Sequence, residues 1–70
     1  MSDDDVLMGM EMVARAERKA GFDGYGKPPA EFAEAVERLI AAGFAERSGD
    51  WVRPTIEGAA RIAGRIHTIQ

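Results

Sequence analysis

The residues best suited to chemistry lie in a glycine-rich segment before the middle of the chain. Gly21 to Lys27 matches the G-x-x-x-x-G-K part of a phosphate-binding P-loop. The next residue is Pro28, where a P-loop needs a serine or threonine to bind magnesium. Pro28 also lacks the backbone N–H group that would donate to a phosphate at the start of a helix. The segment is therefore interpreted as a loop between helices and not as a nucleotide site.

His67, Ser2 and Ser48 are the other candidates for catalysis or metal binding. His67 has no cysteine or second histidine in the chain with which to complete a metal site. Neither serine has a base nearby in the sequence that could activate its hydroxyl group. The sequence therefore predicts no enzyme activity, no metal and no cofactor, and His67 is interpreted as a surface residue.

The chain is short, which limits the number of helices and strands that could position a site. A chain of 70 residues has room for one domain. Ordering it costs on the order of 100 kcal/mol of conformational entropy, which one small core barely offsets. The chain has no cysteine, so disulfide bonds cannot add stability. Self-association remains as a source of stability, and we expect a homodimer or another protein partner.

The charge balance is acidic overall but uneven along the chain. Twelve acidic and nine basic side chains give a net charge of -3, whereas nucleic-acid-binding domains usually carry a basic excess. Residues 1–46 hold ten acidic and five basic side chains, and residues 47–70 hold two acidic and four basic ones. Any contact with nucleic acid is therefore expected mainly in the last third of the chain.

The N-terminus carries acidic residues where a secretory signal would carry basic ones. No apolar run in the sequence approaches the roughly 20 residues that span a bilayer. These two features predict a cytoplasmic protein that makes no contact with a membrane.

Residues 3–20 are predicted to form a helix, because Val6, Met10 and Ala14 recur on one helical face. Three acidic residues at its start and basic residues near its end suit the helix dipole. The glycines and prolines that follow cannot continue a helix, so residues 21–28 are predicted to form a loop.

A second helix is predicted over residues 29–42, beginning with a proline in its first turn. Gly43 supplies a left-handed end to this helix, and Phe44 is placed to pack back on it. Glu34 and Arg38 have the spacing of a stabilising ion pair on the outward side of the helix.

Two short extended runs predict a β-hairpin over residues 44–53, with Ser48 to Asp50 as a three-residue turn. Pro54 is expected to end the second strand because it cannot donate to a ladder. Thr55 is expected to cap a third helix over residues 55–69. The predicted fold class is mainly α with a short β-hairpin.

Two strings in this region resemble winged helix-turn-helix repressors of the MarR and PadR type. The first string is Leu39 to Arg47, and the second is Trp51 to Arg61 with its Thr-Ile-Glu-Gly segment. The resemblance covers about residues 29–69. It implies a compact winged-helix-like domain that lacks the usual middle helix, because the loop before the second helix is too short to hold one.

In such a fold one helix is presented to the DNA major groove, and basic residues of the wing reach phosphates or the minor groove. The resemblance thus implies a small, dimeric, DNA-binding transcriptional regulator that contacts double-stranded DNA. Trp51 is interpreted as a core anchor at the base of the wing, with an exposed contact residue as the alternative. The residues expected to contact DNA are Lys27, Arg38, Arg47, Arg53 and Arg61.

An alternative function is a protein-interaction module, an adaptor or small inhibitor that does not bind DNA. The outward side of the second helix is acidic, which is unfavourable next to phosphates. The first helix carries a second apolar stripe outside its main face, and one short chain cannot cover both sides of it. The acidic residues are Glu31, Glu34 and Glu37, and the predicted oligomer or partner interface is formed by Met8, Met12 and Ala16.

Overall fold

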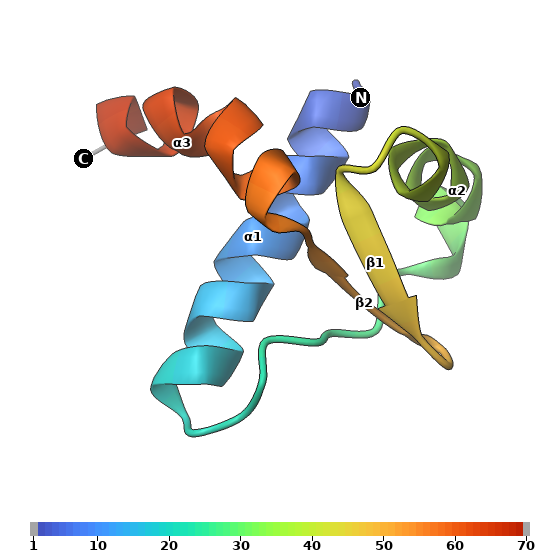
Figure 1. The fold of residues 1–70 in the computed structure, drawn as a ribbon, viewed down its shortest axis with the longest axis horizontal. Helices are drawn as coiled ribbons and strands as arrows, with labels where there is room; N and C mark the ends of the chain where they lie inside the picture. The colour runs from blue at the N-terminus through green and yellow to red at the C-terminus, as the bar shows by residue number, and fades with distance from the viewer. Residues whose placement is uncertain (1, 70) are drawn as a thin grey trace.

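Three helices pack around one β-hairpin in the structure, a computed structural model that describes the backbone of residues 2–69 and the side chains of residues 2–65. The elements in chain order (Figure 1) are α1 (Asp3–Lys19), the short 3-10 helix η1 (Ala30–Phe32), α2 (Ala33–Ala41), β1 (Ala45–Ser48), β2 (Trp51–Pro54) and α3 (Ile56–Ile69). The two strands are antiparallel neighbours. The predicted fold class, mainly α with a short β-hairpin, is confirmed.

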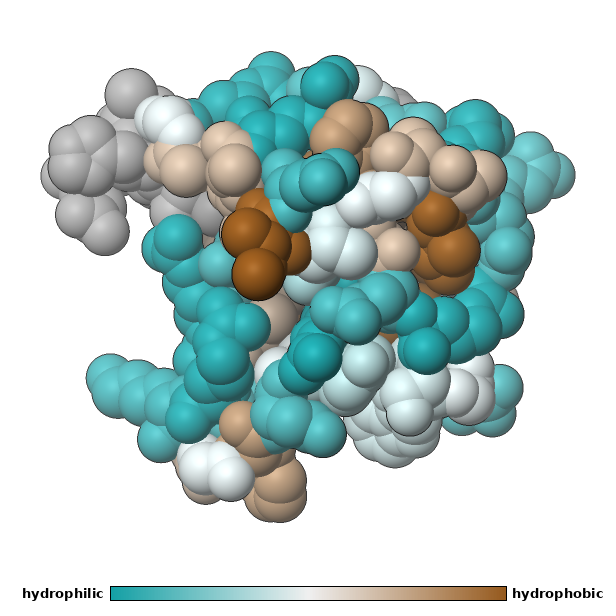
Figure 2. Space-filling model, in the orientation of Figure 1, coloured by the Kyte–Doolittle hydropathy of each residue, from teal (hydrophilic) through white to brown (hydrophobic). Residues whose placement is uncertain are grey.

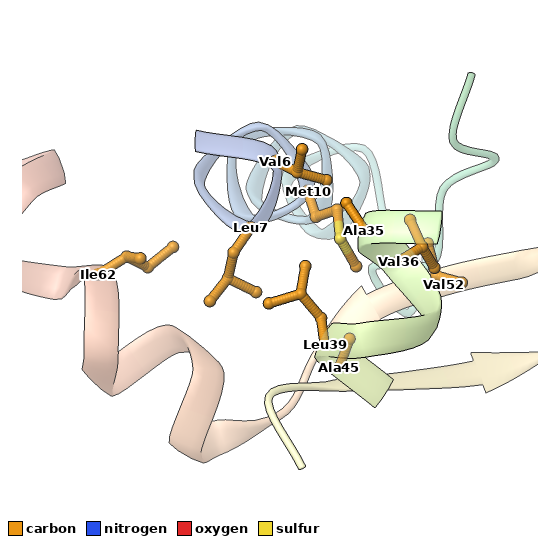
Figure 3. Close-up of a cluster of buried hydrophobic side chains, with 9 residues drawn as sticks. All are labelled: Val6, Leu7, Met10, Ala35, Val36, Leu39, Ala45, Val52 and Ile62. Atoms are coloured by element: carbon orange, nitrogen blue, oxygen red, sulfur yellow. The ribbon is translucent and has the colours of Figure 1, made fainter. Parts of the chain in front are cut away.

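The core lies where α1 meets the other two helices and the hairpin. Leu7 of α1 is fully buried, and Figure 3 shows it between Leu39 of α2 and Ile62 of α3. Burying an aliphatic side chain of this size is worth about 1.5–3 kcal/mol. The buried cluster consists of Val6, Leu7, Met10, Ala35, Val36, Leu39, Ala45, Val52 and Ile62. One face of α1 thus holds both other helices in place.

The start of α1 is capped as its sequence allows. The Asp5 N–H donates to Ser2 Oγ at 3.2 Å, and the Ser2 N–H donates to Asp5 Oδ2 at 3.3 Å. This reciprocal capping box satisfies backbone donors that have no partner within the helix. The first turn of α1 is therefore held at the position from which Asp3 and Asp4 reach the other helices.

Part of the predicted loop at 21–28 joins the sheet. Gly26 bridges Val52 of β2: the Gly26 N–H donates to the Val52 carbonyl at 2.9 Å, and the Val52 N–H donates back at 2.8 Å. Gly26 also lies against α1, where an added Cβ would come within 2.5 Å of Val13 Cγ1. Glycine allows this segment to contact β2 and α1 together, which composition alone did not reveal.

The end of α2 and the start of α3 are joined by one hydroxyl group. Gly43 has a φ of 85°, and the Phe44 N–H donates to the Leu39 carbonyl at 2.9 Å, which confirms the predicted glycine end of this helix. Thr55 Oγ1 donates to the Gly43 carbonyl at 2.7 Å. The same oxygen accepts from the Gly58 N–H at 3.1 Å, so Thr55 caps α3 as predicted.

Gly58 lies directly against the chain that leaves α2. A Cβ built on Gly58 would lie 1.9 Å from the Phe44 carbonyl oxygen. The absence of a side chain therefore lets the first turn of α3 pack on the backbone at Phe44. The glycine in the Thr-Ile-Glu-Gly segment thus has a steric role in this fold.

The second helix begins later than predicted. Residues 29–42 were expected to be helical from Pro29, but Pro29 has a ψ of 144°, which is extended. A 3-10 turn over Ala30–Phe32 follows, and α2 itself begins at Ala33 and ends at Ala41. A proline sets φ but not ψ, so it does not by itself decide where a helix starts.

The hairpin also differs in detail from the prediction. The register pairs Ser48 with Trp51, so the turn contains only Gly49 and Asp50. Pro54 is part of β2 and pairs with Ala45, because the last residue of a short strand can lack a donor. The side chain of His67, which is interpreted above as a surface residue, lies outside the described residues.

We expect Gly58→Ala to lower the free energy of unfolding by about 1–3 kcal/mol, since the new methyl group overlaps the Phe44 carbonyl. Gly64→Ala in the same helix is the matched control, because a Cβ there meets nothing within 4 Å. The control should instead gain about 0.5–1 kcal/mol from helix propensity. Urea denaturation of both variants followed by circular dichroism measures the difference, and equal stabilities would contradict the steric role of Gly58.

Candidate functional site

The arginines predicted to contact DNA are paired with acidic side chains of the same chain. Arg38 of α2 donates twice to Asp3, from Nε to Oδ2 and from Nη2 to Oδ1, both at 2.9 Å. Arg61 of α3 donates to Asp4 Oδ1 at 2.8 Å, and its guanidinium carbon lies 5.0 Å from the centre of the Phe44 ring. These pairs fasten α2 and α3 to the first turn of α1.

The two arginines of the hairpin are held in the same way. Arg47 of β1 pairs with Glu37 of α2. Arg53 of β2 donates to Glu46 Oε2 at 3.1 Å and to the Asp23 carbonyl at 2.5 Å, and it stacks 4.3 Å from the centre of the Tyr25 ring. These contacts tie the hairpin to α2 and to the loop after α1.

The partner of Arg38 differs from the prediction. Glu34 at i, i+4 spacing was expected, but the bidentate bond goes to Asp3, which is 35 positions away. A planar guanidinium favours a carboxylate that it can meet with two parallel bonds. In the sequence, the acidic run at the N-terminus is the one sign of this ion pair, and its position at the start of a helix indicates only a favourable contact with the helix dipole.

The ion pair also affects titration at the N-terminus. The hydrogen bonds from Arg38 hold the pKa of the Asp3 carboxyl below its ordinary value. The hydrogen bonds from Ser2 lower the pKa of Asp5 in the same direction. Both groups therefore favour the folded state in their charged form.

Lys27 stands apart from these arginines. It is exposed and makes no ion pair with any of the described residues. It borders a pocket of about 320 Å³ between α1, the segment 26–29 and β2. The residues lining this pocket are Asp5, Val6, Gly9, Met10, Val13, Gly26, Lys27, Pro28, Pro29, Phe32 and Val52. The lining is apolar except for the acidic side chain of Asp5 and the basic side chain of Lys27.

The predicted interface residues of α1 separate into two groups. Met8 is partly buried and packs against the core. Met12 is 58% exposed, and Ala16 is exposed as predicted. Val13 and Gly9 lie on the same outward side. Met8 therefore contributes mainly to the core. Gly9, which was not predicted as an interface residue, is exposed on the outer surface of α1.

Other large apolar side chains are exposed at separate points. Trp51 is 51% exposed next to the turn, so it does not anchor the base of the hairpin, and the exposed position fits the alternative interpretation. Phe22 and Ile56 are also exposed, after α1 and at the start of α3 respectively. On the face of the molecule that Figure 2 shows, the hydrophobic areas are small and are separated by hydrophilic residues. The face in this view offers no continuous apolar surface.

Within the part of the chain that the structure describes, no group of three histidine, cysteine or carboxylate side chains could hold a metal ion. No described helix is long and apolar enough to cross a membrane. Comparison with family models, curated proteins and solved structures finds no match to this chain.

We expect the free energy of unfolding to decrease as the pH falls from about 5 toward 2. Asp3 and Asp5 have lowered pKa values in the folded state, so they stabilise it above the pKa of an unfolded aspartate, about 3.9. This contribution is lost as the pH falls through the lowered values. Asp3→Asn should make the decrease shallower, because it removes one of the two groups with a lowered pKa. Urea titrations at a series of pH values test this, and an equal decrease in Asp3→Asn and the unmodified protein would contradict it.

Proposed function

We propose that the chain is a protein-interaction module that acts through the outer side of α1 and does not bind nucleic acid. One observation carries the proposal. All four arginines expected to reach DNA are paired with carboxylates of their own chain, while Met12 and Val13 on α1 remain exposed. The charge that would bind phosphate is thus compensated locally, and apolar surface is left open.

The electrostatics of α2 support the same choice. Its solvent side carries Glu34 and Glu37, with Glu31 in the preceding turn, and its own cation Arg38 is paired with Asp3. Affinity for DNA comes largely from cations that neutralise phosphates and release counterions. A helix presented with these carboxylates outward would repel a phosphate backbone.

The outer side of α1 has the composition of a contact surface. A surface helix normally presents charged and polar residues on the side opposite the core. Between its charged ends, the outer side of α1 presents Gly9, Met12 and Ala16 instead. Gly9 and the half-exposed Val13 also line the apolar pocket. Methionine adapts to irregular partners because its side chain is flexible and polarisable.

Fluorescence anisotropy on duplex DNA tests the proposal. We expect no binding by the unmodified protein at about 50 mM salt, where phosphate contacts are strongest. Glu37→Gln combined with Glu46→Gln releases Arg47 and Arg53 from their partners and should create weak, salt-sensitive binding. Glu31→Gln combined with Glu34→Gln changes the net charge equally without releasing an arginine, and it should bind less than the first pair. Salt-dependent binding by the unmodified protein would contradict the proposal.

A dimeric DNA-binding regulator is the second candidate. The hairpin favours it, because Arg47 and the half-exposed Trp51 lie on the strands that follow α2. Exposed ion pairs contribute little free energy, so a phosphate can replace the carboxylate partner. Under this function Arg47→Ala combined with Arg53→Ala would abolish binding in the same anisotropy experiment.

A further inference from the structure

The outward side of α1 carries a repeat, of which the contacts among the described residues explain only Asp5, through its capping box with Ser2. Five exposed residues follow at steps of four, three, four and three, the average spacing at which two helices pair along a seam. The residues of this seam are Asp5, Gly9, Met12, Ala16 and Lys19. Its centre is apolar, one end is acidic and the other end is basic.

The charges at the two ends lie symmetrically about the centre. Met12 is seven residues from Asp5 and seven from Lys19. At 1.5 Å per residue each end lies about 10.5 Å from Met12 along the helix axis. A two-fold rotation through Met12 therefore brings Asp5 of one chain opposite Lys19 of another.

We propose that the outer side of α1 pairs with α1 of a second copy of this chain, antiparallel and centred on Met12. The inference rests on the proposed function, because it uses the same surface, and it names the partner. Asp5 of each copy contacts Lys19 of the other, and Gly9 lies near Ala16 of the other. A parallel pair would place like charges together at both ends, which is repulsive.

The end charges are available for this contact. Lys19 makes no ion pair with any of the described residues. Asp5 accepts from Ser2 through Oδ2, and a carboxylate has further acceptor positions for an ammonium group. The bonds within the chain therefore leave both ends of the seam able to pair.

Gly9 is explained by such a partner and not by the chain itself. A Cβ on Gly9 would meet nothing within 4 Å, so the isolated fold does not need glycine there. Glycine in an exposed helix is unfavourable, but it allows another helix to approach closely. Gly9 and Val13 also line the pocket, so the Met12 side chain of the second copy meets an open mouth beside Gly9.

Cysteine cross-linking tests the pairing directly, because the chain has no cysteine of its own. We expect Met12→Cys to form a disulfide-linked dimer on mild oxidation. Gly9→Cys mixed with Ala16→Cys should form the mixed dimer, while Gly9→Cys alone should form little. Ala60→Cys, exposed on α3, is the control for random collision. No more dimer with Met12→Cys than with the control, or efficient self-linking of Gly9→Cys, would overturn the proposal.

Two further variants separate dimerisation from folding. Gly9→Leu should keep or raise the thermal stability of the monomer but weaken the dimer, with an increase in dissociation constant of about tenfold or more. Lys19→Glu should weaken the dimer, whereas Lys19→Arg, which keeps the positive charge at the same position, should not. Sedimentation over a range of protein concentrations measures the constants.

The sedimentation results also distinguish this proposal from the proposed function. A monomer at several hundred micromolar that also fails to bind DNA overturns the second-copy partner, while a protein-interaction role remains. DNA binding by a dimer with the expected cross-links overturns the proposed function but supports the pairing of α1.

Discussion

The burial of Leu7 between α2 and α3 is the contact on which the arrangement of the helices depends. Its side chain is fully buried and lies between Leu39 and Ile62. In a chain of 70 residues few side chains can serve two helices at once. Leu7, Met10 and the buried Ala14 all face inward, and no element among the described residues covers the opposite side of α1. The open seam on α1 thus follows from how the core is built.

The ion pairs follow from the same packing. Once Leu7 places α1 between the other helices, Asp3 and Asp4 at its first turn come within reach of Arg38 and Arg61. Each such exposed pair is worth little in stability. Their larger consequence is electrostatic, because they compensate cations that a reader of DNA would need free. The choice between a DNA-binding and a protein-binding function therefore depends on pairings that link distant parts of the chain.

In the two strings that resemble winged-helix repressors, several residues stabilise local structure in this chain. Gly43 ends α2 in a left-handed conformation, and Thr55 joins that end to the start of α3. Gly58 is required because its neighbour is the Phe44 carbonyl. These residues explain the turn from helix to hairpin to helix without any contact to DNA. Within this fold Gly43, Thr55 and Gly58 form a junction between helix and hairpin, and any DNA recognition would have to come from the basic residues of the same strings, Arg47, Arg53 and Arg61.

The sequence by itself determined the features that depend on near neighbours. The Thr55 cap, the glycine end at Gly43, the three helices and the hairpin were all predicted, because each is set by residues a few positions apart. Tertiary structure decided which cations stay available, that Gly26 joins β2, and that Met8 packs inward while Met12 stays exposed. These outcomes depend on residues far apart in the chain, whose distances are set only when the helices pack together.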